Sequence, residues 1–199
     1  PYSDLPQNLV QALIATEDAR FYEHSGIDAI GTLRAVVFLG QRGGASTISQ
    51  QLARQLFVGV RSRNLLEAVT QKVKEWVIAT RLERNYTKEE IIAMYLNIYD
   101  FGYNADGIRS AARIYFGKEP RDLKAEESAV LVGMLKNSSL YNPLRREELV
   151  LNRRNTVLAQ MEKYGYLTTA DRDSLTALDM DINYNPETHS QGPAPYFRM

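Results

Sequence analysis

The sequence predicts a mainly α-helical fold without a regular β-sheet. Apolar residues recur at the three- and four-residue spacing of one helix face along most of the chain. Two capping-box patterns, Thr87-x-x-Glu90 and Thr168-x-x-Asp171, mark helix starts. No segment shows the strict alternation that is typical of a half-buried strand, so β-structure is expected only as a small hairpin near the tail.

Proline, glycine and cap residues set the expected order of the helices. Pro6 suits the first helical position, and its helix is expected to run to about residues 21–24. An apolar stretch follows at 27–39, and Ser46 or Thr47 is expected to cap the next helix. Residues 97–104 and 137–143 read as loops, and the last twenty residues as extended. The further helices are expected at 46–57, 64–84, 87–96, 105–116, 125–135, 147–164 and 168–178.

Composition excludes several classes of function. The chain of 199 residues balances 24 Lys and Arg against 24 Asp and Glu, whereas general nucleic-acid binders are usually basic. It has no Cys and only two His, which rules out thiolate chemistry and a histidine-rich metal centre, and no metal site is predicted. No apolar run is long enough to span a bilayer.

The ends of the sequence suggest a piece of a longer protein. The chain begins at Pro1 without Met and stops after a polar tail. We expect residues 1–185 to form the domain and residues 186–199 an extended tail.

A first group of candidate residues lies at 17–26, near the end of the first helix. It combines three carboxylates, one Arg and His24. Glu17 shares a helix face with Leu13, so it is expected to be partly buried, and burial makes a carboxylate a better base near neutral pH. The alternative is a solvated helix end with ordinary ion pairs.

A second candidate site is the segment 43–54, where Gly43 and Gly44 lead into Ser46 and Thr47. Glycines before a helix N-terminus with free N–H groups can bind phosphate, and Arg54 follows in the same helix. The Gly-Lys-Ser/Thr ending of a Walker loop is missing. The alternative is a plain loop and helix cap.

A third candidate pair is Lys72 and Glu75, which are three residues apart on one helix face. The pair is either a surface salt bridge or a cationic clamp beside a second carboxylate. Taken together, the three groups offer two carboxylates, an anion-binding helix start and several cations. That combination favours transfer of a sugar from a diphosphate leaving group, with positive charge on the departing phosphates.

The same residues, in the same order, resemble glycosyltransferase family 51, the glycan-polymerising domain of class A penicillin-binding proteins and monofunctional transglycosylases. The resemblance covers nearly the whole chain and rests on five ordered motifs. They are Glu17-Asp18 with Phe21, His24 and Gly26; residues 43–52; Lys72-x-x-Glu75; residues 88–97; and residues 127–135 with Tyr141-Asn142-Pro143 and Arg153-Arg154-Asn155.

The sequence departs from the family pattern at two places. Gln71 stands where the third motif usually has Arg, which removes one expected cation, and Lys74 or Arg54 is the expected substitute. The aromatic and glycine residues of the loop at 98–104 are shifted from the commoner order, so no catalytic role is assigned to that loop.

The resemblance implies a lysozyme-like helical lobe and a smaller, apolar, membrane-associated lobe at about 27–60. The apolar side of this smaller lobe would lie in the bilayer interface, where a lipid substrate resides. The alternative for this stretch is a plain core helix. The tail resembles the bridge to a transpeptidase domain in bifunctional members, so a further C-terminal domain is expected.

The resemblance also implies a mechanism. Glu17 takes the proton from the 4-hydroxyl of lipid II as it attacks, with inversion, the anomeric carbon of a glycan chain carried on undecaprenyl diphosphate. Asp18 and His24 shape this site with Phe21, and Glu75 lies near the leaving diphosphate. Phosphates and sugars are held by Thr47, Gln51, Arg54 and Lys72.

Expected partners follow from the same resemblance. They are lipid II, the growing lipid-linked glycan, the membrane interface, cell-wall synthesis proteins and phosphoglycolipid inhibitors such as moenomycin, but no nucleic acid. No cofactor is required, although a divalent cation such as Mg²⁺ or Mn²⁺ could stimulate. The expected location is the extracytoplasmic face of the bacterial cytoplasmic membrane.

Two other functions remain open. A muramidase or lytic transglycosylase can use a single Glu on a similar helical scaffold, but it has no need of the diphosphate site predicted at 43–54. A non-catalytic module could capture lipid-linked sugars or partner proteins. Intact Glu17 and Glu75 speak against this second alternative.

Overall fold

The chain folds into helices joined by short loops in a computed structural model, which describes residues 1–37, 46–59, 62 and 64–186. No strand occurs among these residues, and Asp100 and Asp106 form an isolated antiparallel bridge. The mainly α expectation is therefore confirmed. The α-helices are α1 (Gln7–Glu17), α2 (Ala29–Val37), α3 (Ile48–Ala53), α4 (Leu65–Asn85), α5 (Lys88–Ile98), α6 (Gly107–Phe116), α7 (Ala125–Met134), α8 (Glu147–Lys163) and α9 (Thr169–Thr176).

Shorter helical turns connect these elements. A π-helical segment, η3 (Arg54–Val58), directly continues α3, and 3₁₀ turns are formed by η1 (Tyr2–Asp4), η2 (Phe21–Glu23) and η4 (Pro120–Asp122). No helix in the described part of the chain is both long enough and apolar enough to cross a membrane.

The side-chain caps predicted from the sequence form where expected. The Thr87 and Thr168 hydroxyls accept hydrogen bonds from the backbone N–H groups of Glu90 and Asp171, whose carboxylates bond back to complete both capping boxes. Thr47, rather than Ser46, caps α3. These local signals fix the starts of α3, α5 and α9.

The first helix is shorter than predicted, because it ends at Glu17 instead of at 21–24. At Asp18 the backbone leaves the helix with φ −159° and ψ 75°. The Asp18 carboxylate accepts a hydrogen bond from the backbone N–H of Ile48, at 3.1 Å, and contacts His24. Asp18 therefore bonds to a distant segment, and the chain resumes as a 3₁₀ turn from Phe21.

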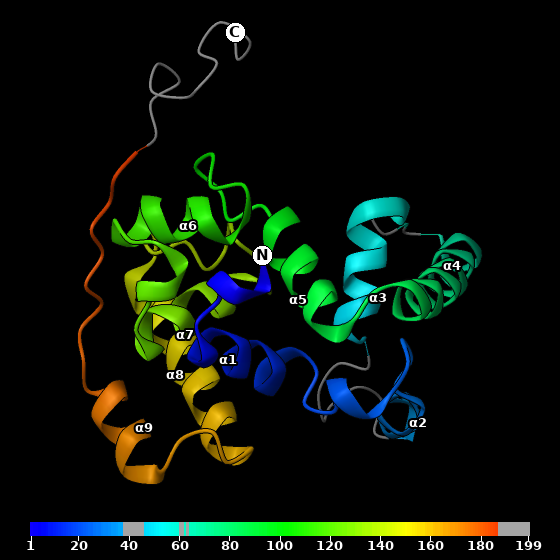
Figure 1. The fold of residues 1–199 in the computed structure, drawn as a ribbon, viewed down its shortest axis with the longest axis horizontal. Helices are drawn as coiled ribbons and strands as arrows, with labels where there is room; N and C mark the ends of the chain where they lie inside the picture. Colours follow the sequence, from blue (N-terminus) through cyan, green and yellow to red (C-terminus); the bar gives the residue numbers. More distant parts are fainter. Residues whose placement is uncertain (38–45, 60–61, 63, 187–199) are drawn as a thin grey trace, which may run out of the picture.

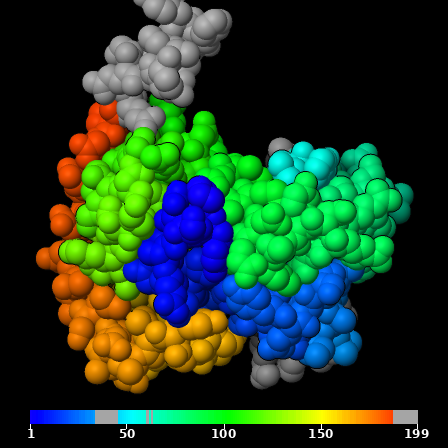
Figure 2. Space-filling model, in the orientation of Figure 1, coloured from blue at the N-terminus to red at the C-terminus, as the bar shows by residue number. Residues whose placement is uncertain are grey.

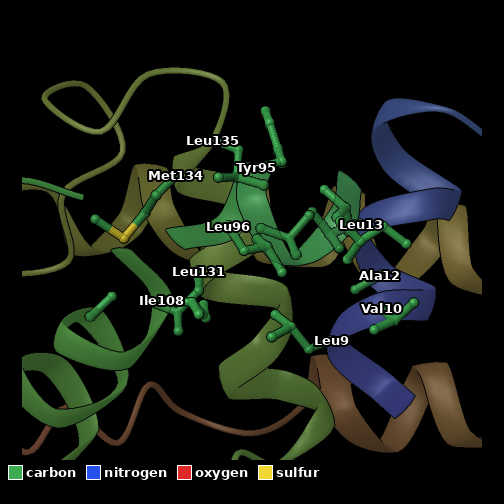
Figure 3. Close-up of a cluster of buried hydrophobic side chains, with 14 of the residues drawn as sticks. Leu9, Val10, Ala12, Leu13, Tyr95, Leu96, Ile108, Leu131, Met134 and Leu135 are labelled. Carbon is green, nitrogen blue, oxygen red and sulfur yellow. The ribbon is translucent and has the colours of Figure 1, made fainter. Parts of the chain in front are cut away.

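The hydrophobic core forms between α1, α5, α6 and α7. Figure 3 shows Leu9 and Leu13 of α1, Leu96 of α5 and Leu131 of α7 converging in this core, and all four side chains are fully buried. Removing such apolar area from water is the main force that holds these helices together. The same packing fixes the end of α1, where Glu17 lies.

The helices are arranged in two lobes. A body contains α1, α6, α7, α8 and α9, and a smaller lobe contains α2, α3, η3 and α4, while α5 lies between them (Figure 1). In the space-filling view, the first residues lie on the surface of the body, beside the green α5 region that leads to the smaller lobe (Figure 2).

The segment that follows α9 packs along the body. The backbone N–H groups of Asn183 and Asn185 donate to the carbonyls of Tyr115 and Ile114, at 3.0 and 2.7 Å. Buried Arg154 holds the end of α9 by donating to the carbonyl oxygens of Thr176 and Leu178. The predictions for the tail at 187–199 and for the glycines Gly43 and Gly44 lie outside the described residues.

Candidate active site

The Glu17 carboxylate lies at the C-terminal end of α1 and is mostly buried, with 16% of its side chain exposed. Its Oε2 accepts a hydrogen bond from the amide Nε2 of Gln51, at 2.9 Å. Its Oε1 faces Nη2 of Arg153, at 3.9 Å. Gln51 therefore holds one carboxylate oxygen, while the other lies beside a cation.

Tyr95 of α5 fixes the orientation of Gln51, because its hydroxyl donates to Gln51 Oε1 at 2.9 Å. Burial raises the pKa of Tyr95 well above its ordinary value, and the negative charge of Glu17 raises it further, while Arg54 opposes the shift. Tyr95 thus stays a neutral donor. The Gln51 amide oxygen is occupied by Tyr95, and its NH₂ group is left to face Glu17.

Asp18 and His24 attach α3 to the end of α1. Nε2 of His24 lies 3.0 and 3.1 Å from the two Asp18 carboxylate oxygens, one of which also accepts from the Ile48 N–H. An anion at this position stabilises a helix start, because the first N–H groups have no partner within the helix. Both residues therefore set the position of Gln51 through α3.

Phe21 is fully buried beneath this junction. The Lys88 ammonium lies 4.2 Å from the centre of its ring and donates to the His24 carbonyl oxygen at 2.7 Å. The same ammonium pairs with buried Glu83 at 2.7 Å, and Glu83 accepts from the Ser49 hydroxyl. Phe21 and His24 are thus fixed by groups from α3, α4 and α5.

Thr47 uses its hydroxyl within the protein. It donates to the Gly26 carbonyl at 2.8 Å and accepts from the Gln50 N–H at 3.1 Å, and the residue is 1% exposed. Gly26 has a φ of +90°, and a Cβ there would lie 2.8 Å from the α4 backbone, so glycine is required. The prediction that Thr47 contacts substrate stays a prediction.

Lys72 and Glu75 form a second cluster, which contacts α3 through Gln50. The Lys72 ammonium donates to Ser46 Oγ at 2.9 Å, Gln50 Oε1 at 3.0 Å and Glu75 Oε2 at 2.9 Å. Glu75 is buried and Lys72 is partly exposed. Because an ammonium group has three protons, each of them has a protein acceptor in this arrangement.

Adjacent glutamines of α3 connect the two clusters. Gln51 bonds to Glu17, and Gln50 bonds to Lys72. Arg54 begins η3 directly after α3, close enough to Tyr95 to affect its titration. The structure thus links Glu17 to α3 through Gln51, and Lys72 with Glu75 to α3 through Gln50.

Gln71, which stands in place of the usual Arg, and its two expected substitutes, Lys74 and Arg54, differ in their surroundings. The side-chain oxygen of Gln71 accepts a hydrogen bond from the Ser62 N–H at 2.8 Å. Lys74 is exposed on α4, and Arg54 is partly buried. The substitution of either residue for the missing Arg stays a prediction.

Sequence reasoning assigned no site role to three residues that contact the two clusters, Arg153, Tyr95 and Ser46, nor to Glu83, which bonds Lys88 and Ser49 beside them. Arg153 and Tyr95 were visible only as members of the quoted motifs, and Ser46 only as an alternative helix cap. Glu83 carried no signal, because its partners come from α3, α5 and the loop before α2. In the described part of the chain, no group of three or more His, Asp or Glu side chains could hold a metal ion.

Comparison with known proteins agrees with this fold. The family model described as "Transglycosylase" matches residues 1–162. Penicillin-binding protein 1A of Escherichia coli (strain K12) is 42% identical over 95% of the chain, and penicillin-binding protein 1F of Bacillus subtilis (strain 168) is 37% identical over 96%. The chain spans 22% and 26% of the length of these two proteins.

A solved structure shows the same fold. The crystal structure of penicillin-binding protein 1A from Haemophilus influenzae aligns with 92% of the chain at a TM-score of 0.54 and 24% identity, and the chain covers 17% of that protein. The fold is therefore that of a helical transglycosylase domain. The chain belongs to the transglycosylase family, glycosyltransferase family 51.

Proposed function

We propose that the chain is a peptidoglycan glycosyltransferase that polymerises lipid II into β-1,4-linked glycan strands, with Glu17 as the general base. The observation that carries this proposal is the position of the mostly buried Glu17 carboxylate. Gln51 of α3 orients this carboxylate, and the neighbouring Gln50 of the same helix bonds to the Lys72 ammonium. Family membership supports the same class of activity.

In the proposed reaction, the 4-hydroxyl oxygen of lipid II forms a bond to the anomeric carbon of the donor glycan. The bond from that carbon to the diphosphate oxygen breaks, and its electron pair leaves with the undecaprenyl diphosphate. Glu17 takes the hydroxyl proton. The attack comes from the face opposite the leaving group, so the configuration inverts.

Positive charge is needed where the diphosphate departs. Lys72 and Arg54 are the proposed sources, with Glu75 holding the Lys72 ammonium in place. Because all three Lys72 protons are already donated, a phosphate oxygen would have to replace one acceptor. Ser46 is the expected one, since it is neutral and lies just before α3.

We propose supporting roles for the other predicted residues. Asp18, His24 and Phe21 hold the junction between α1 and α3, and through it the Gln51 amide. Gln51 also contacts the sugars, as the resemblance implies. Thr47 holds phosphate only if its hydroxyl gives up the hydrogen bond to the Gly26 carbonyl and donates to a phosphate oxygen instead. A divalent cation would assist the diphosphate without being required.

We also propose that the smaller lobe rests in the membrane interface. Exposed large apolar side chains recur along α4 at helical spacing, with exposures of 78% for Leu66, 56% for Val69 and 49% for Val73 and Val77. Ile30 and Leu33 of α2 and Phe57 of η3 are also exposed. Such surfaces usually mark a partner or a membrane, and a lipid-linked substrate requires the second.

The proposed location and partners follow from this membrane association. The relatives are penicillin-binding proteins by name. We propose that this chain acts at the extracytoplasmic face of the cytoplasmic membrane, together with other cell-wall synthesis proteins. Phosphoglycolipids such as moenomycin would compete with the growing glycan for the Lys72 and Arg54 region.

The decisive test is Glu17→Gln in a polymerisation assay with lipid II. Turnover should fall by about 10²–10⁴, the usual effect of losing a general base, because the amide cannot take a proton. Glu23→Gln, an exposed position in the same segment, is the matched control and should keep full activity. Parent-level polymerisation by Glu17→Gln would contradict the assignment.

The same assay separates synthesis from cleavage. With lipid II the glycan should lengthen, and with finished peptidoglycan no soluble fragments should appear. Fragment release without polymer growth would instead support the muramidase or lytic alternative.

A further inference from the structure

Arg153 of α8 is the side chain that faces the free oxygen of Glu17. Only 13% of its side chain is exposed. Its Nη2 lies 3.9 Å from Glu17 Oε1, and its Nε donates to the Gly133 carbonyl of α7 at 3.4 Å. Its guanidinium carbon lies 5.7 Å from the centre of the Tyr141 ring. The guanidinium is thus held between α7 and the loop before α8.

Gly133 leaves room for the stem of Arg153. Glycine is unfavourable in a helix interior, yet Gly133 lies inside α7 and is buried. A Cβ at this position would lie 3.0 Å from Arg153 Cγ and 3.8 Å from Arg153 Cβ. An added methyl group would therefore require the Arg153 stem to shift by a few tenths of an ångström.

The separation between Arg153 and Glu17 is too long for a direct hydrogen bond but within the reach of an ion pair. Gln51 bonds to Oε2, so Oε1 keeps its lone pairs for an incoming hydroxyl. Arg is suited to this place because its charge is permanent and its planar donors can bond the Gly133 carbonyl while facing the carboxylate.

We infer that Arg153 is a positioning residue for the reaction. Its contacts with the Gly133 carbonyl and the Tyr141 ring hold the guanidinium beside Glu17, so that Glu17 Oε1 points to the acceptor hydroxyl. This inference rests on the proposed role of Glu17. It extends the proposed site to Arg153, which is 136 positions after Glu17 in the sequence and lies on α8, outside the smaller lobe.

The test compares Arg153→Gln, Arg153→Lys and Gly133→Ala in lipid II polymerisation and thermal unfolding. Arg153→Gln should lower kcat by about 10²-fold, as a small misplacement of a reacting group does, with little change in KM. Arg153→Lys should recover part of the loss, because the charge remains but the planar donors do not. Gly133→Ala keeps both charges and should show an intermediate kcat. Arg145→Gln, in which another Arg loses its bond to Tyr103, should retain the parent kcat.

A double variant distinguishes positioning from general destabilisation. If Arg153 acts through Glu17, adding Arg153→Gln to Glu17→Gln should cause no further loss of activity. A further loss of the full size would overturn the inference, as would parent kcat in Arg153→Gln alongside an inactive Glu17→Gln. Full activity in Glu17→Gln would instead remove the proposed function itself. Should Arg153→Gln not fold, Arg153→Lys and Gly133→Ala decide, and parent kcat in both would contradict the inference.

Discussion

Lys72 gives a residue-scale prediction, because its ammonium is the cation paired with buried Glu75. Lys72→Met keeps a long apolar stem but leaves the Glu75 carboxylate without its cation. We expect a loss of about 1–3 kcal/mol in the free energy of unfolding, the usual effect of an unsatisfied buried group. Polymerisation should also slow, because one leaving-group cation is lost.

Urea unfolding and lipid II turnover measure the two effects of Lys72→Met. Arg84→Met is the matched control, since Arg84 is exposed on the same helix and has no proposed role in the site. An unfolding midpoint and a turnover equal to those of Arg84→Met would refute the prediction.

The sequence could predict contacts between near neighbours but not between distant residues. The Lys72–Glu75 pair follows from a spacing of three on one helix, and Thr47 was one of the two caps expected for α3. The bond between Gln51 and Glu17 joins residues 34 apart, and no periodicity reports it. The same holds for Arg153, which reaches Glu17 only because α8 packs on α1.

Local signals account for most helix boundaries at the element scale, and α1 shows where they fail. Residues 18–24 contain polar and aromatic side chains, which are compatible with the last turns of a helix. The pattern alone therefore allows the helix to continue through them. The competing interactions come from α3, whose Ile48 N–H bonds to Asp18. A boundary set by a tertiary contact cannot be read from the segment itself.

The exposed apolar side of α4 gives a prediction at the same scale. Leu66→Ser together with Val73→Ser should weaken binding to phosphatidylcholine vesicles at least about tenfold, because each buried aliphatic side chain contributes roughly 1.5–3 kcal/mol. Phosphatidylcholine is zwitterionic, so a difference in binding between the variant and the parent chain does not reflect attraction to charged lipid. Sedimentation with vesicles gives the bound fraction.

Leu149→Ser is the matched control for this experiment, because Leu149 is exposed on α8 in the body rather than in the smaller lobe. It should bind vesicles like the parent chain. Equal binding by the α4 double variant would contradict the proposed membrane contact.

At the scale of the whole molecule, buried tyrosines predict loss of stability at alkaline pH. Burial is the main cause that raises the pKa of Tyr99 and of Tyr115 to about 12, from an ordinary value of 10.0, and it raises the pKa of Tyr95 well above that ordinary value. The folded state therefore resists ionisation that the unfolded chain undergoes. This stability is complete below about pH 10 and is lost as the pH rises through about 12.

Thermal unfolding between about pH 8 and pH 12 measures this loss. Tyr99→Phe should be less stable at neutral pH, since the bond to the Met134 carbonyl is lost. Its melting temperature should nevertheless fall less steeply above pH 10 than that of the parent. Tyr164→Phe, at an exposed position, should follow the parent curve, and identical slopes in all three proteins would contradict the prediction.

The helical class of the molecule was predictable from periodicity, caps and the absence of alternation. The division into a helical body and a smaller lobe was expected from the family resemblance alone, because periodicity does not report which apolar faces meet. The resemblance places the smaller lobe at about 27–60, and α4 lies beside α3 in the same part of the molecule (Figure 1). The bounds of that lobe stay a prediction.

The short helix α3 has a consequence for how this enzyme family could change. Its neighbouring glutamines bond to Glu17 and to the Lys72 ammonium, from a segment of six residues. Under the proposed mechanism, any substitution that rotates this segment would disturb acceptor activation and leaving-group departure at once. Natural variation in rate or product length should therefore arise in the surrounding helices, while α3 itself tolerates little change.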